Sequence, residues 1–160
     1  MIDHINFDRL ASRAFQWARS QEELILKYGS PLSPAQAADA GSVGVQDVAR
    51  IRVLVVDRIL LPEDDELAEA ARRAQIITDA SRAVTFGHGI VIRADSWQNR
   101  EALVHSLVHV AQCERSGGLE AFVSAYLADR VTSADFSVGS LEDEARGLAR
   151  EICSAQTATA

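Results

Sequence analysis

The sequence predicts an α+β fold in which a small mixed or antiparallel sheet packs against one buried helix, with further helices before and after it. Three observations indicate this class. Apolar residues recur at helical spacing over most of the 160 residues. Two runs rich in β-branched residues, 51–57 and 83–92, interrupt that pattern. Short stretches with glycine and proline separate the segments, and the length suits a single domain over residues 1–160.

Residues 1–44 predict an N-terminal helical part. A long amphipathic helix is expected over 6–28, and Gly29 is a natural stop for it. Ser33 followed by Pro34 is typical of an N-cap with proline at the first helical position, so a short helix should continue to about residue 40. The glycines within 41–44 then predict a turn.

Residues 45–155 predict a core of strands and helices. A helical turn over 45–50 leads into the strand 51–57, and the acidic residues after Pro62 favour the start of a helix. The run 83–92 predicts a second strand. Its middle is weakened by Gly87 and Gly89, which indicate a bulge or the close approach of another backbone.

Three helices are expected in the remainder of the chain. The first spans about 99–115, and it is apolar on nearly every side, so it should be buried. A glycine pair ends it, and a second helix follows over 119–129. After a loop over 130–139, the last helix spans 141–153.

Composition and charge exclude several classes of protein. The chain is 48% hydrophobic with a formal net charge of −7, which argues against a nucleic-acid partner because phosphate contacts need clustered cations. No apolar run reaches the roughly 18 residues of a membrane span, and the start MIDHINFDRL lacks the pattern of a signal peptide. Cys113 and Cys153 lie in apolar helical contexts and are expected to be reduced, buried thiols. The expectation is a soluble, cytoplasmic protein.

The stretch 105–112, HSLVHVAQ, carries the strongest chemical signal. His105 and His109 are four residues apart on a predicted helix, so both point to the same side and can share one metal ion. A histidine pair alone is a weak motif, and two structural histidines bonded to backbone would also explain it. The predicted burial favours metal, because buried imidazoles need partners.

A third ligand can come from the last helix, which begins with Leu141-Glu142-Asp143-Glu144. A catalytic zinc site needs three protein ligands and a water molecule. Glu142 and Glu144 point to different sides of that helix, so only one of them can join the histidines.

Residues 83–150 resemble the small gluzincin-type zinc metallopeptidases. The likeness comprises A-x-T-x-G-x-x-I-x-I on a strand, L-V-H-x-L-V-H-V-A-Q on a helix and L-E-x-E-A on a later helix. It implies a zincin-like fold with Zn²⁺ bound by His105, His109 and Glu142. It also implies a cleft strand that pairs with an extended peptide or protein segment. The substrate-binding residues would then be Phe86, Gly87, His88 and Gly89.

Two positions depart from the family pattern. Ser106 stands where these enzymes carry the glutamate of H-E-x-x-H, which acts as the general base. Serine is a poor base at neutral pH, and loss of a general base commonly costs about 10²–10⁴-fold in rate. Arg146 stands four residues after Glu142, where gluzincins often have an Asp or Asn that supports a histidine ligand.

The sequence therefore leaves three functions open. The first is a zincin-fold protein with a degenerate motif that binds zinc and peptide with weak or no peptidase activity. The second is a working zinc peptidase in which Glu101 or Glu114 replaces the base. The third is a metal-free structural or interaction domain. Two further residues have double interpretations: His88 is an ordinary strand histidine or an extra ligand, and Tyr126 is a core residue or an oxyanion donor in the cleft.

Overall fold

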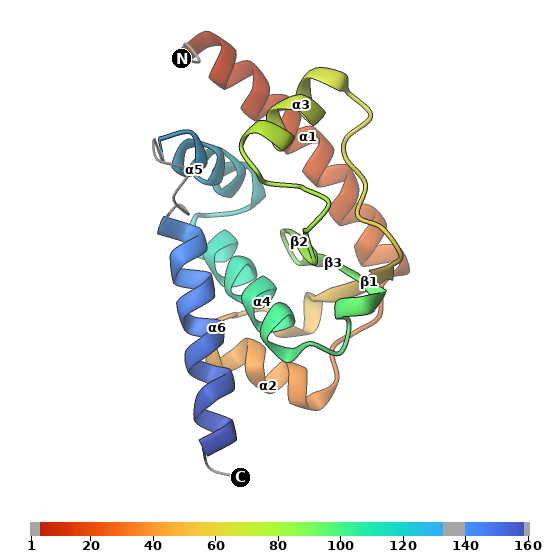
Figure 1. Ribbon diagram of the computed structural model, residues 1–160, viewed down its shortest axis with the longest axis vertical. Coiled ribbons are helices and arrows are strands. Elements are labelled where there is room, and N and C mark those ends of the chain that lie inside the picture. Colours follow the sequence, from red (N-terminus) through yellow and green to blue (C-terminus); the bar gives the residue numbers. More distant parts are fainter. Residues whose placement is uncertain (1–3, 133–139, 159–160) are drawn as a thin grey trace.

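The computed structural model describes residues 4–132 and 140–158 (Figure 1). This part of the chain contains helices and one three-stranded sheet, so the predicted α+β class is confirmed. The elements are α1 (His4–Tyr28), α2 (Pro34–Ser42), a 3₁₀ turn (Val48–Arg50), β1 (Arg52–Val56), α3 (Asp65–Arg73), β2 (Ala83–Phe86), β3 (Gly89–Arg93), a second 3₁₀ turn (Ala94–Ser96), α4 (Arg100–Arg115), α5 (Leu119–Thr132) and α6 (Ser140–Ala158).

The sheet is mixed and has the order β1-β3-β2. β1 runs parallel to β3, whereas β2 runs antiparallel to it. The prediction of one strand over 83–92 is wrong, because this segment forms a hairpin of β2 and β3. Gly87 turns the chain with a φ of 65°, and the Glu22 carboxylate lies where a side chain on Gly87 would begin. The glycine signal was therefore a turn between two strands.

Two hydrophobic clusters cover the two faces of the sheet. Ile90 and Ile92 of β3 point to one face and pack with apolar residues of α4 and α6. Val91 points to the other face and packs with Ile25 of α1. The alternation follows from the two-residue period of a strand. It places the sheet between α1 and α4, as the arrangement in Figure 1 also shows.

Side-chain caps begin three of the helices, and the predicted cap of α2 at Ser33 is confirmed. Ser33 and Gln36 form a capping box on α2, with Pro34 as its first residue. Asp64 caps α3, and the Asn99 side chain accepts a hydrogen bond from the backbone of Ala102 to begin α4. α5 extends through Thr132, three residues past the predicted end of that helix at 129, and the rest of the predicted loop lies outside the described residues.

Helix α4 is held between β2 and α6, and most of its middle residues are buried. Cys113 on this helix is buried, and burial raises the pKa of its thiol to about 12. Within 4–132 and 140–158, which include both cysteines, there is no disulfide. No helix in these ranges combines the length and the apolar character needed to cross a membrane.

Replacement of Gly89 by alanine tests the close packing of α1 on the sheet. A Cβ at this position would lie 2.9 Å from the Cβ of Ile25, so Gly89→Ala forces α1 away from β3. We expect a loss of about 1–3 kcal/mol in the free energy of unfolding, measured by urea denaturation. The control is Gly147→Ala on α6, where nothing lies within 4 Å of the added methyl, and it should be neutral or stabilise by up to about 1 kcal/mol. Equal stability of the two variants would contradict this packing.

Candidate metal site

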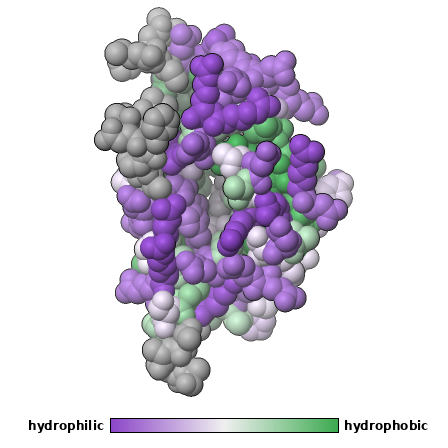
Figure 2. All heavy atoms as spheres, viewed as in Figure 1, coloured by the Kyte–Doolittle hydropathy of each residue, from purple (hydrophilic) through white to green (hydrophobic). Residues whose placement is uncertain are grey.

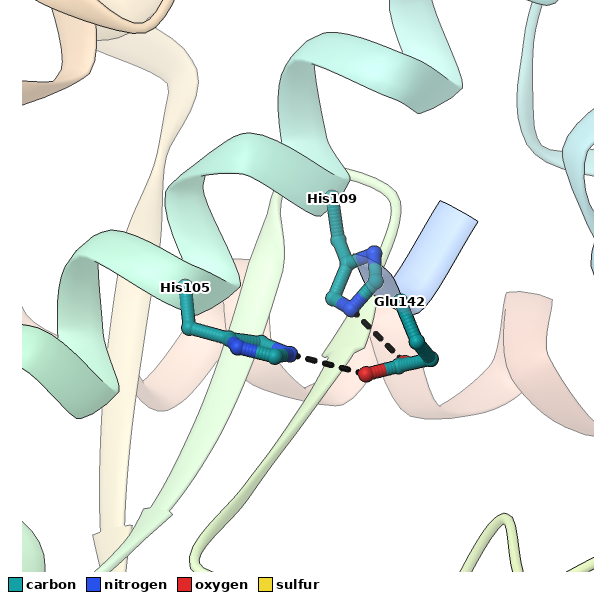
Figure 3. A group of neighbouring side chains, drawn as sticks. All are labelled: His105, His109 and Glu142. Carbon is teal, nitrogen blue, oxygen red and sulfur yellow. Dashed lines mark hydrogen bonds and ion pairs between the residues drawn. The ribbon is translucent and has the colours of Figure 1, made fainter. Parts of the chain in front are cut away.

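Three predicted ligands meet at one point between α4 and α6 (Figure 3). The Nε2 atoms of His105 and His109 lie 2.9 Å from the Oε2 and Oε1 atoms of Glu142, respectively. All three potential ligand atoms lie within 4.8 Å of one another. The group could hold a metal ion. Ligand atoms held tetrahedrally at about 2.0–2.2 Å from zinc lie about 3.3–3.6 Å apart, which falls between the 2.9 Å N–O separations and the 4.8 Å limit of the group.

Local structure explains why these side chains converge. His105 and His109 occupy successive turns on one side of α4, and their ring centroids are 4.9 Å apart. Asp129 of α5 caps α6, because its carboxylate accepts hydrogen bonds from the backbone N–H groups of Ser140 and Leu141. This cap fixes the first turn of α6, and Glu142 in that turn points back toward the histidines.

The Gln112 side chain determines the orientation of His109. It is 1% exposed, and its amide nitrogen donates to two groups that only accept, the carbonyl of Leu141 and the carboxylate of Glu144. Its oxygen must therefore face Nδ1 of His109, at 2.8 Å, and accept a hydrogen from it. A neutral His109 then has its lone pair on Nε2, which is the atom a metal would bind.

This assignment has a consequence for the contact between His109 and Glu142. A lone pair on Nε2 would face a carboxylate oxygen at 2.9 Å, and two acceptors do not approach so closely without a proton or a metal ion between them. The geometry of Gln112 therefore leaves Nε2 of His109 as the ring atom that shares a proton with Glu142 or binds a metal ion.

Tyr126 of α5 completes the surroundings of Glu142. Its hydroxyl donates a 2.7 Å hydrogen bond to Oε1 of Glu142. Burial, together with the neighbouring Glu142 charge, raises the pKa of Tyr126 well above its usual value, so the phenol keeps its proton. Burial alone would raise the pKa of Glu142, but the hydrogen bonds from His105 and His109 outweigh it and hold that pKa well below its usual range.

Glu144, the alternative third ligand, points elsewhere. Its carboxylate accepts hydrogen bonds from Gln112 and from Arg115, both on α4. Its contacts therefore tie α6 to α4 beside the histidine cluster.

Ser106 is 2% exposed, and its hydroxyl donates a 3.3 Å hydrogen bond to the carbonyl of Ala102, one turn earlier on α4. The backbone carbonyl of Ser106 accepts a hydrogen bond from the Thr85 hydroxyl, which joins α4 to β2. The side chain at the motif position is thus directed to its own helix and offers no acidic or basic group.

A cavity of about 970 Å³ opens in front of the cluster. His105, Ser106, His109 and Glu142 form part of its wall. Figure 2 shows a hollow near the middle of the visible face, with hydrophobic side chains beside it and a largely hydrophilic surface around it. The other apolar walls come from α1, α3, β2 and α5, including Leu10, Trp17, Leu67, Phe86, Phe122 and Leu127.

The four residues predicted to bind substrate are not brought together on this cavity. Phe86 lines it, whereas Gly87, His88 and Gly89 do not. His88 instead places its Nε2 atom 2.9 Å from Glu114, and its backbone N–H donates to Glu22. The cavity wall includes all four residues of β2, Ala83–Phe86, which is one of the two edge strands of the sheet.

The two glutamates considered as substitute bases also lie outside the cavity wall. Glu114 binds His88 and the backbone N–H groups of Gln46 and Asp47. Glu101 is half exposed and faces Arg150. Gln112 and Tyr126 were the residues that sequence reasoning underrated. Gln112 lies three residues after His109, a spacing that places two side chains on one side of a helix and could have indicated the contact.

Comparisons with known proteins identify no similar protein. No family model matches the chain, and no curated protein or solved structure gives a significant match.

The depressed pKa of Glu142 predicts a pH-dependent stability in protein kept metal-free with a chelator. A carboxyl whose folded pKa is lowered contributes stability that is present above its unfolded pKa, about 4.3, and is lost as the pH falls through the folded value. Between about pH 5 and pH 3, the free energy of unfolding should therefore fall more steeply in the native chain than in Glu142→Gln. Urea denaturation at several pH values measures both slopes, and parallel slopes would contradict the assigned ion pairs.

Proposed function

We propose that this chain is a zincin-like protein that binds zinc through His105, His109 and Glu142, with weak or no peptidase activity, and that it binds a peptide or protein segment in the adjoining cavity. One observation carries the proposal. Two imidazoles and a carboxylate converge on one point of a cavity wall, while the residue at the position of the general base is Ser106.

Zinc suits the donor set best. Two neutral imidazoles and one carboxylate form a ligand set found in catalytic zinc sites, where the fourth position stays open. Zinc bound there would supply Lewis acidity toward a carbonyl group. The residues of the chain supply the rest: Gln112 holds the proton on Nδ1 of His109, and Tyr126 holds the Glu142 carboxylate in place.

The cavity wall lacks a free general base for peptide hydrolysis. Apart from Glu142, the carboxylates on the cavity wall are Glu66 and Glu69. Each of them is committed to arginines: Glu66 pairs with Arg9 and Arg13, and Glu69 with Arg72 and Arg73. The described residues of the cavity wall therefore offer no free carboxylate that could take a proton from water and pass it to a leaving amine.

Peptide binding is supported by the position of β2. This strand bonds to β3 on one side only among the described residues, and its residues line the cavity. An edge strand presents unpaired backbone N–H and C=O groups, to which an extended peptide can add as a further strand. Aromatic and aliphatic walls would then receive side chains of the peptide.

A metal-free interaction domain is the second candidate. It is favoured by the observation that every buried side-chain nitrogen and oxygen in the described ranges has a hydrogen-bond partner. With both histidines protonated, the cluster would be a buried set of ion pairs. The two candidates differ in one measurable property, the retention of zinc.

Zinc content separates these candidates. Protein purified without a histidine tag and loaded with zinc should retain about one ion per chain after desalting. His105→Ala should lose the ion, because two ligands bind zinc far more weakly than three. The matched control is His88→Ala, which removes a histidine outside the cavity and should retain the ion. A zinc content near zero in the native chain would contradict the proposed zinc site and support the metal-free interaction domain.

Substitution of Ser106 tests whether the missing general base limits peptide hydrolysis. Ser106→Glu places a carboxylate at the motif position. Ser106 lies on the cavity wall but is 2% exposed with its hydroxyl bonded to Ala102, so the longer side chain must turn from its own helix toward the cavity. We expect zinc-dependent cleavage of a fluorogenic peptide library to rise by about 10²-fold or more over the native chain. Ser106→Gln, which has the same size without a base, is the control. A native chain that cleaves as fast as Ser106→Glu would instead support an active peptidase.

A further inference from the structure

The cavity carries a different charge from the rest of the protein. Four arginines and three glutamates lie on its wall, a net charge of +1, whereas the whole chain has a net charge of −7. A divalent ion on the histidine cluster would make the cavity more positive. Its walls are otherwise mainly apolar, so an anion with an apolar portion is the ligand chemistry that it favours.

Three of the four arginines already have partners. Arg9 pairs with Glu66, and Arg73 pairs with Glu69. Arg130 donates hydrogen bonds to the backbone carbonyl of Ala74, which fixes its guanidinium against the end of α3. These three therefore help to build the wall.

Arg146 is different. It lies on α6 one turn after Glu142, an arrangement in which a glutamate and an arginine normally attract each other. However, both oxygens of Glu142 are taken by His105, His109 and Tyr126. Arg146 forms no ion pair with any side chain in the described part of the structure, and it is exposed on the cavity wall.

We propose that Arg146 is the recognition residue for a carboxylate on the bound ligand, with an apolar group of the same ligand held in the cavity. This inference rests on the proposed function. A guanidinium binds a carboxylate through two parallel hydrogen bonds, so it recognises this group better than a neutral amide. Two kinds of ligand share the chemistry: the C-terminus of a peptide and a free apolar carboxylic acid.

The placement also gives the ligand a direction. The backbone of Arg146 lies four residues, roughly 6 Å along α6, after Glu142, and both side chains line the same cavity. A peptide held by its C-terminal carboxylate would thus present its last residues, with their apolar side chains, to the histidine cluster and β2. The site is specific for a chain end, whereas strand addition alone would accept an internal segment.

Calorimetry on the zinc-loaded full chain tests the inference with three probes. These are N-acetyl-Ala-Ala-Phe with a free carboxylate, the same peptide with a C-terminal amide, and 3-phenylpropionate. The acid peptide should bind about ten- to a hundredfold more tightly than the amide, which is the usual loss for one charged hydrogen-bond partner. Arg146→Gln should remove this preference by weakening only the acid. Arg150→Gln, which changes an exposed arginine one turn further along α6 and outside the cavity wall, should keep it.

The outcomes separate failure of the inference from failure of the proposed function. Equal binding of acid and amide, or a preference that survives in Arg146→Gln, overturns the role of Arg146 and leaves peptide binding intact. If neither peptide nor 3-phenylpropionate binds to the zinc-loaded native chain, both the proposed peptide site and this inference are overturned. If only 3-phenylpropionate binds, and its binding depends on Arg146, the peptide site is overturned and the ligand is a free acid. Tight binding of the acid peptide without 3-phenylpropionate identifies a peptide C-terminus.

Discussion

The candidate site depends on one buried amide. Gln112 joins α4 to the first turn of α6, because its nitrogen bonds to both Leu141 and Glu144 while its oxygen faces His109. An unpaired amide in this position would cost about 1–3 kcal/mol, so the side chain is strongly held in one orientation. That orientation sets the proton on His109 and brings Glu142 within reach of both histidines. The distance between the two helices and the chemistry of the site are therefore determined together.

Local signals predicted most of the secondary structure, and tertiary contacts explain what they missed. Ser33, Asp64 and Asn99 act as caps through bonds to residues three positions away, so they are readable in the sequence. The hairpin at Gly87 was missed because a glycine signals conformational freedom without specifying the turn, and Glu22, far away in sequence, occupies the space beside it. Glu142 was chosen from a family likeness, whereas its bonds to Tyr126 and the capping of α6 by Asp129 depend on the packing of α5.

In the proposed zinc site, the residues that would bind the ion are separate from the residue at the position of the general base. The atoms that would bind zinc come from two helices that are fixed by capping and by Gln112, whereas the Ser106 side chain bonds only to the carbonyl of Ala102 on its own helix. Under the proposed function, a serine at position 106 would limit hydrolysis and leave the ligand set and the cavity intact. In this view the serine is compatible with a fold that still presents β2, apolar walls and Arg146 to a ligand.

The position of α1 has a consequence for how the chain folds. This helix is made before the sheet and α5. Its apolar side, including Ile25, nevertheless packs on Val91 of β3 and contacts α5, both of which come much later in the sequence. Such long-range contacts raise the contact order and slow folding. During synthesis the apolar side of α1 stays without these partners until the β2–β3 hairpin and α5 have emerged, so α1 exposes apolar surface that a molecular chaperone could cover.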